Sequence, residues 1–206
     1  MSRIIPELGR TLPDGRRHLG RRQVSSILVT VLVTSSLWPC WGAFGADKLI
    51  GAPAPEWQVA NWLNSAPLHL RDLRGKVVLI RWWTAPDCPY CQATAPALNE
   101  FYKKYHSRGL EVVGFYHHKS NEPLDVDAVK EFARSFGFQF PVAIDPDWKT
   151  LHRWWLDGHA RPFTSVSFLI DRDGIIRHIH PGGQYVKGDK NFAEMKEKIE
   201  ELLAEK

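Results

Sequence analysis

The sequence predicts an α/β domain with a mixed β-sheet. Apolar runs of strand length alternate with longer amphipathic stretches along most of the chain, which is typical of parallel strands joined by helices. Near the end, two strand-like runs flank Asp171-Arg172-Asp173-Gly174, a turn sequence that predicts an antiparallel hairpin. With 206 residues, 44% hydrophobic and 24% charged, the composition suits one globular domain with short appendages.

In its first half, the sequence of the domain predicts an edge element, a buried strand and a helix. The stretch Ala52–Leu70 has short apolar pieces between prolines, which favours a strand or hairpin at a sheet edge. Lys76–Trp83 is an apolar, β-branched run and therefore predicts a buried strand. The spacing from Pro89 to about His106 predicts a helix that ends near Gly109.

The second half continues the alternation and ends on a helix. The apolar residues of Asp125–Phe136 recur at helical spacing. Asp145 or Asp147 is expected to cap a short helix. The remaining predicted elements are the strands Leu110–Tyr116, Pro141–Ile144, Val166–Ile170 and Ile175–His180, and the helices Asp147–Trp155 and Asn191–Leu203.

Residues 1–46 have the organisation of a secretory signal peptide, and residues 47–206 form the predicted domain. A basic stretch ends at Arg21-Arg22, an apolar stretch of about Val24–Trp38 follows, and small residues come next. An uncleaved membrane anchor, a lipoprotein attached through Cys40 and twin-arginine export are the alternatives. We therefore expect an exported protein, periplasmic or otherwise extracytoplasmic, in a compartment where disulfides persist.

The whole formal charge of +4 lies in this leader, which contains six arginines and only two acidic residues. Residues 47–206 carry equal numbers of basic and acidic side chains. A nucleic-acid partner is not predicted, because the domain has no basic excess to displace counterions.

The predicted chemistry is concentrated in Cys88-Pro89-Tyr90-Cys91, where the buried strand gives way to a helix. Cys88 is therefore expected at a helix N-terminus, where free N–H groups and the helix dipole favour an anion. Such a site lowers a cysteine pKa from about 8.5 to between roughly 3.5 and 7.5, and the thiolate is the nucleophile of disulfide exchange. Half of a zinc site and a purely structural disulfide remain alternatives.

This pattern resembles the thioredoxin superfamily, and most closely the exported TlpA/ResA-type thiol–disulfide oxidoreductases of the AhpC/TSA "redoxin" group. The resemblance covers about residues 51–205. It implies a three-layer fold, in which helices flank a mixed central sheet, with an N-terminal strand or hairpin extension and a central insertion. The residues that carry it are Cys88-Pro89-Tyr90-Cys91, Pro96, Phe168–Asp171, Gly51–Pro55, Leu73–Val78 and the insertion Asn121–Phe140.

The resemblance also implies roles. Cys88 would be the exposed attacking thiolate, Cys91 the more buried resolving thiol, and Pro96 would kink the active-site helix. No metal or organic cofactor is needed. The partners would be envelope proteins with thiols or disulfides, and a redox-recycling partner. Trp83 and Tyr90 are expected to border the redox groove, and His159–Phe163 to shape its other wall. The direction of electron flow is not fixed by the sequence.

Several residues depart from the family pattern. Asp87 replaces the usual tryptophan before the first cysteine, and its carboxylate disfavours a thiolate. Arg81 would offset this if its guanidinium reached the site, and would otherwise be a snorkelling or edge-strand charge. Thr94 and Trp82 take the places of the glutamate and aspartate that act on protons in relatives. No proton carrier is therefore assigned.

The loop opposite the pair departs furthest, because Ser165 takes the position of the family's cis-proline. A cis bond before a non-proline residue costs roughly 2.5–4 kcal/mol, so Thr164–Ser165 is expected to be trans. This loop is similar to that of peroxiredoxin-like members. A thiol peroxidase is therefore the alternative function, although Ala85 and Arg81 stand where the peroxidase motif has its hydroxyl residue and proline.

A copper-handling protein is the third hypothesis, since thiolates and imidazoles suit Cu(I). His117-His118 lie at the end of a predicted strand, and His117 could approach the pair. His178 and His180 share one face of another strand and are expected at the surface.

Overall fold

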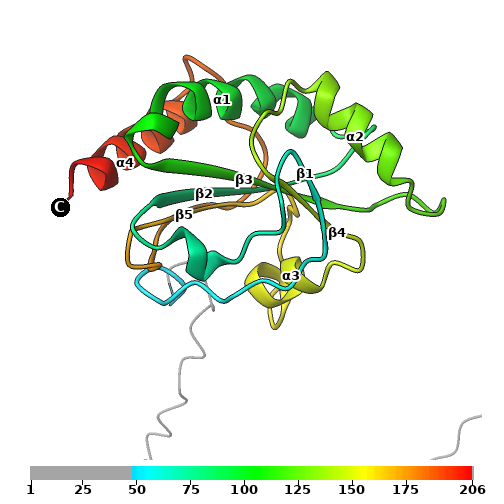
Figure 1. Cartoon of the computed structure of the whole chain (residues 1–206), viewed down its shortest axis with the longest axis horizontal. Helices are drawn as coiled ribbons and strands as arrows, with labels where there is room; N and C mark the ends of the chain where they lie inside the picture. The colour runs from blue at the N-terminus through cyan, green and yellow to red at the C-terminus, as the bar shows by residue number, and fades with distance from the viewer. Residues whose placement is uncertain (1–47, 206) are drawn as a thin grey trace, which may run out of the picture. The chain divides into compact units, whose positions relative to one another are not determined.

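A mixed β-sheet organises the chain in the computed structural model, which describes residues 48–205 (Figure 1). The strand order is β1-β4-β3-β2-β5-β6. β2, β3 and β4 run parallel, whereas β1 is antiparallel to β4, and β5 is antiparallel to both β2 and β6. The strands are β1 (Asn61–Leu63), β2 (Val77–Trp83), β3 (Leu110–His117), β4 (Val142–Asp145), β5 (Ser167–Ile170) and β6 (Ile176–His180).

Helices cover both faces of this sheet. Figure 1 shows α1, α2 and α4 on one face, and α3 on the other. A π-helical turn, His152–Leu156, continues α3. Within the described part of the chain, no helix combines the length and apolarity needed to cross a bilayer. The helices are α1 (Pro89–Tyr105), α2 (Val126–Ser135), α3 (Lys149–Leu151) and α4 (Lys190–Ala204).

The core has two layers because side chains alternate across a strand. All of β2 is buried. Its residues Val77, Leu79 and Trp83 pack under α1 and α4. Val78, Ile80 and Trp82 pack on the opposite face, among a second group of aromatic and aliphatic side chains. Central β2 therefore leads directly into α1 between two apolar layers, and this fixes the strand-to-helix junction that carries the cysteines.

The predicted order of elements is confirmed, with one correction to the third helix. Of the two alternatives for Ala52–Leu70, the edge strand is confirmed: it contributes the short strand β1 and an isolated bridge between Pro53 and Ile175, and no hairpin of its own. The prolines explain this, because each removes a backbone donor from a ladder. The predicted helix Asp147–Trp155 contains only three α-helical residues before the π-helical turn.

Asp145 is the carboxylate that caps α3, although it is the last residue of β4. Its Oδ2 accepts hydrogen bonds from the backbone N–H groups of Thr150 and Leu151, both at 3.0 Å. Asp147 instead forms an exposed ion pair with Lys149 at 3.0 Å. The buried carboxylate thus satisfies donors that the helix start leaves free.

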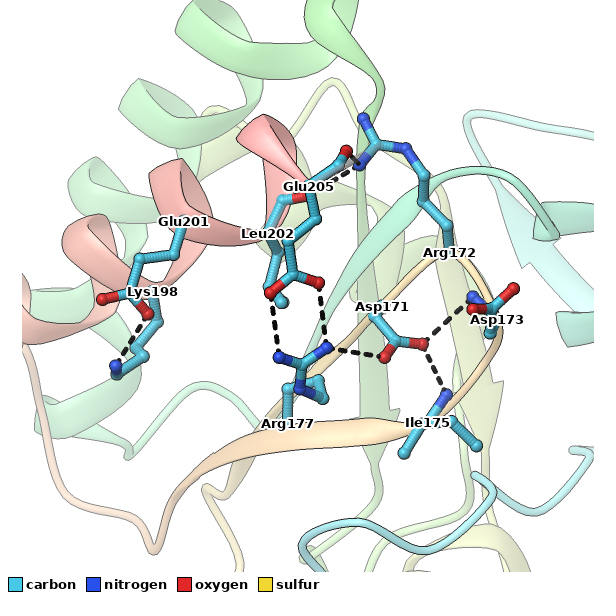
Figure 2. A network of polar contacts seen from close by, with 9 residues as sticks. All are labelled: Asp171, Arg172, Asp173, Ile175, Arg177, Lys198, Glu201, Leu202 and Glu205. Atoms are coloured by element: carbon cyan, nitrogen blue, oxygen red, sulfur yellow. Dashed lines mark hydrogen bonds and ion pairs between the residues drawn. The ribbon is translucent and has the colours of Figure 1, made fainter.

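Figure 2 shows how the β5–β6 hairpin holds the end of α4. Nη1 of Arg172 donates to the carbonyl oxygens of Leu202 at 2.6 Å and Glu205 at 2.8 Å. Arg177 forms ion pairs with Glu205 at 2.9 Å and Asp171 at 3.0 Å. The hairpin turn therefore satisfies carbonyls that the last turn of a helix leaves without partners.

Candidate active site

Cys88 and Cys91 are joined by a disulfide at the start of α1, and their Cα atoms are 5.2 Å apart. Cys88 is the N-cap residue and Pro89 occupies the first turn, where its missing N–H costs no helix bond. The backbone N–H of Cys91 points at Cys88 Sγ, with an N–S distance of 3.2 Å. When the disulfide opens, this donor and the helix dipole lie where they stabilise negative charge on Cys88.

The two cysteine residues differ in exposure. Cys88 is 8% exposed and Cys91 is 2% exposed. A reaction partner in solution therefore meets Cys88 first. This is the order that the expected roles of the two cysteines require.

A pocket of about 360 Å³ opens over the disulfide. Of the residues proposed from the sequence, it is lined by Asp87, Cys88, Pro89, Tyr90, Cys91, Thr164 and Ser165. Pro162 and Phe163, from the expected wall His159–Phe163, also line it, and Thr84, His117 and Lys119 complete it. We call residues 162–165 the wall segment. His159, Ala160 and Arg161, which were expected in this wall, do not line the pocket.

Trp83, Pro96 and Arg81, which were also proposed from the sequence, do not line the pocket. Trp83 is buried under the helices, against the rings of Tyr116 and Phe138 at 5.1 and 5.3 Å. It belongs to the core layer on the face of β2 that packs under the helices. Pro96 is an exposed residue within α1, which continues through it. The kink itself stays a prediction.

Arg81 is neither a snorkelling nor an edge-strand charge, and it does not reach the pair. It lies in the central strand with 1% of its surface exposed. Its Nη2 donates to the carbonyl oxygen of Gly183 at 2.6 Å. The position of β2 in the middle of the sheet explains the difference, since both of its edges are covered by neighbouring strands.

His117, at the end of β3, connects the pocket floor to the wall segment. Its Nε2 lies 3.0 Å from Thr164 Oγ1, and its ring meets the ring of Trp148 edge-on at 5.0 Å. Burial lowers the pKa of His117 to about 3, and the Lys119 ammonium acts in the same direction. The imidazole is therefore neutral at physiological pH.

Lys119 is a pocket residue that the sequence analysis missed. Its ammonium lies 5.9 Å from the centre of the Trp148 ring, and burial lowers its pKa. In the described part of the chain, no carboxylate forms an ion pair with it. It follows β3 by two positions, but no pattern in the sequence distinguishes it from the other surface lysines.

The mouth of the pocket carries two exposed aromatic rings. Tyr90 is 43% exposed and Phe163 36% exposed, and their rings meet edge-on with centroids 5.6 Å apart. Exposed aromatic side chains beside a reactive group commonly bind apolar parts of a partner. The site therefore combines a redox pair with an apolar rim.

The profile of the AhpC/TSA family matches residues 50–179. The chain belongs to the AhpC/TSA family. A thiol–disulfide oxidoreductase ResA from Bacillus thuringiensis is 34% identical over 155 residues, which cover 72% of this chain and 80% of that protein. Like that relative, this AhpC/TSA-family protein is a thiol–disulfide oxidoreductase, and its own CxxC pair is Cys88–Cys91.

Solved structures of similar proteins agree with this assignment. A thiol-disulfide isomerase from Corynebacterium glutamicum superposes with a TM-score of 0.59 and 28% identity, covering 76% of this chain and 98% of that one. A putative thiol:disulfide interchange protein DsbE from Chlorobium tepidum gives a TM-score of 0.61 and 25% identity, covering 75% and 98%. The predicted thioredoxin-like three-layer fold is confirmed.

Within this family, the residues near the pair show what the departures mean. The described chain has one cis peptide bond, Ala85–Pro86, so Thr164–Ser165 is trans as expected. Thr94 is fully buried and accepts a hydrogen bond from the backbone N–H of Tyr185 at 3.3 Å. Thr94 thus has a packing role in place of the family's acid.

The two alternative functions find little support in the geometry. A peroxidase would need a guanidinium at the reacting sulfur, but Arg81 is engaged by Gly183. For copper, residues 48–205 contain no group of three or more His, Cys, Asp or Glu side chains arranged to hold a metal ion. His180 was expected at the surface, but it is buried. It is 8% exposed, and its ring meets the Tyr185 ring edge-on at 5.1 Å.

Proposed function

We propose that this oxidoreductase exchanges its Cys88–Cys91 dithiol or disulfide with protein partners outside the cytosol. The observation that carries the proposal is the position of Cys88: it caps α1 at the floor of an open pocket, with Cys91 behind it. The apolar rim of Tyr90 and Phe163 supports a polypeptide partner, because it offers binding surface beyond the sulfur atoms.

In the reducing direction, the reaction has two steps. The Cys88 thiolate attacks a disulfide sulfur of the partner, a mixed disulfide forms, and the other partner sulfur leaves as a thiolate and takes a proton. Cys91, as its thiolate, then attacks Cys88 Sγ. The partner is released as a dithiol, and the Cys88–Cys91 disulfide forms. Two electrons pass to the partner, and a redox-recycling protein must restore them. In the oxidising direction, the same steps run backwards.

The location outside the cytosol is proposed from the sequence of residues 1–46, which has the organisation of a leader or membrane anchor. These residues lie outside the part of the chain that the structure describes. A disulfide enzyme needs a compartment whose redox poise permits its cycle. We expect a fusion of the full chain to an alkaline phosphatase reporter to be active, and a fusion that lacks residues 1–46 to be inactive.

Trapping of partners tests the function and the roles together. Replacing Cys91 with serine should leave mixed disulfides between Cys88 and partner proteins, because the resolving sulfur is missing. The matched variant Cys88→Ser should trap far fewer, since Cys91 is the more buried sulfur. Equal trapping by the two variants would contradict the assignment of roles. If neither variant traps a protein, the proposal that the partners are proteins would be contradicted.

The reduction potential of the pair decides the direction of electron flow. A potential near that of thioredoxin, about −270 mV, would indicate a reductant, whereas one near −120 mV would indicate an oxidant. The measurement requires equilibration of the pair against glutathione or dithiothreitol buffers, followed by thiol labelling.

A further inference from the structure

Arg81 is a buried cation that the exchange reaction does not use directly. Besides Gly183, it contacts Ser167 Oγ at 3.4 Å and the face of the Tyr185 ring at 5.4 Å, and its Nε has no hydrogen-bond partner. Among the described residues, no acidic side chain forms an ion pair with it. Burial lowers the pKa of Arg81 to about 10, so it stays charged at neutral pH. An unpaired buried charge is destabilising, so its retention needs a compensating reason.

Gly183 connects this cation to the pocket. Its carbonyl oxygen accepts from Arg81, and its backbone N–H donates to Ser165 Oγ at 3.3 Å. Gly183 has φ +79° and its neighbour Gly182 has φ +126°, conformations that favour glycine. A Cβ on Gly182 would also collide with Phe163 Cβ. The β6–α4 loop therefore lies directly against the wall segment and is held from behind by Arg81.

Ser165 occupies the position where the resemblance places a proline, and it is 5% exposed. A proline ring would restrict the backbone but could not accept the hydrogen bond from Gly183. At position 165 the wall segment thus has no proline ring and has a side-chain contact to the β6–α4 loop instead. Gly183 of that loop is in turn hydrogen-bonded to the guanidinium of Arg81 on the central strand.

We propose that Arg81 is a positioning residue: through Gly183 it fixes Ser165, and so holds the wall segment in the position where a polypeptide docks beside Cys88. This inference rests on the proposed function. It assigns no chemical step to Arg81. Its effect should therefore appear with a peptide disulfide, which contacts the wall segment, and not with a small disulfide, which contacts only the sulfur.

The experiment compares two disulfides that release the same coloured group. The protein is the full chain with Cys40→Ser and Cys91→Ser, so that Cys88 is its one remaining thiol. One probe is cysteine joined to thionitrobenzoate, and the other is a short apolar peptide whose central cysteine is joined to thionitrobenzoate. In both, the Cys88 thiolate attacks the cysteine sulfur, the bond to thionitrobenzoate breaks, and the yellow thiolate is released. The ratio of the peptide rate to the cysteine rate measures docking.

Four substitutions are added to this background. Ser165→Ala removes the acceptor for Gly183, and Arg81→Met removes the guanidinium. Ser167→Ala is the matched control, because Ser167 contacts Arg81 and the Tyr185 hydroxyl in the same buried cluster but does not line the pocket. The Arg81→Lys variant, which keeps the charge but loses the planar fork, is included in case Arg81→Met does not fold.

We expect Ser165→Ala and Arg81→Met to lower the rate ratio by roughly 3- to 10-fold, the effect of losing one hydrogen bond. In Arg81→Met, whose altered residue does not line the pocket, the cysteine rate should change by less than about 2-fold. Ser167→Ala should leave the ratio unchanged. The rate ratio of the double variant Ser165→Ala/Arg81→Met should fall no further than that of either single variant, because the two residues act in series. An unchanged ratio in Ser165→Ala, or an equal fall in Ser167→Ala, would overturn the inference. A background protein that reacts with neither probe would instead contradict the proposed function.

Discussion

At the scale of single residues, the pocket surrounds the cysteine pair with an ammonium, a neutral imidazole and a carboxylate. Lys119 and Asp87 both line it, and they act on a Cys88 thiolate with opposite sign. Both side chains are exposed to solvent, which screens each charge. Of the two, only the lysine has the sign that stabilises a thiolate.

Replacing Lys119 with methionine should therefore reduce the thiolate fraction of Cys88 at neutral pH. We expect alkylation of the reduced protein by iodoacetamide to slow by about 3-fold or more, because the thiolate is the reacting species. Lys119→Arg, which keeps the charge, serves as the control and should retain most of the rate. Identical pH–rate curves for the two variants would show that the ammonium does not act on the pair.

The shifted pKa of His117 predicts a pH dependence of the free energy of unfolding. Its pKa is about 3 in the folded state, whereas an unfolded imidazole titrates near 6.5. Between these values the unfolded state binds more protons, so the free energy of unfolding should fall as the pH is lowered through that window. The slope is at most about 1.4 kcal/mol per pH unit for this one group. Denaturant unfolding at several pH values, compared with His117→Gln, isolates the contribution. Equal pH dependence in both proteins would contradict it.

At the scale of elements, the start of α3 depends on one buried carboxylate. Asp145→Ala should destabilise the protein by about 1–3 kcal/mol, because it leaves the N–H groups of Thr150 and Leu151 without an acceptor. Asp147→Ala is the natural control. Its side chain is exposed, and we expect a change within about 0.5 kcal/mol. Urea unfolding midpoints measure both. A larger loss for Asp147→Ala would reverse the assignment of the cap.

Most elements could be predicted from the sequence because their signals are local. The apolar run of β2, the helical spacing of α1 and the cysteines between them needed no information from elsewhere in the chain. The environment of Arg81 could not be predicted, since Gly183, its hydrogen-bond partner, is 102 residues further along the chain. The orientation of Trp83 was missed for the same reason, because local pattern does not show which face of β2 borders the groove. Lys119 enters the pocket through packing of the loop after β3, which has no sequence signature.

At the scale of the whole domain, the first and last parts of the described chain are attached to the sheet by different means. Pro53 bridges to Ile175, and the end of α4 is held by Arg172 and Arg177 (Figure 2). Arg172 bonds carbonyl oxygens, whereas the ion pairs of Arg177 are partly exposed and are screened by solvent. The Arg172 contacts should therefore contribute more to stability.

Replacing Arg172 with alanine should lower the free energy of unfolding by about 1–2 kcal/mol, the effect of two or three lost hydrogen bonds at a partly exposed helix end. The control is Lys198→Ala, which removes an exposed ion pair with Glu201 within α4 and should change it by less than about 0.5 kcal/mol. Thermal unfolding at low and high salt would separate the two kinds of contact. Equal losses would show that α4 is not held by the hairpin turn.

The unequal exposure of the two cysteine residues also has a practical consequence for labelling. After mild reduction, a bulky maleimide should add to Cys88 and then block the narrow approach to Cys91, so that the domain takes up a single label without any substitution. A dye or spin probe could thus be placed at the entrance of the groove of the otherwise unaltered domain, where it would report each partner that docks there.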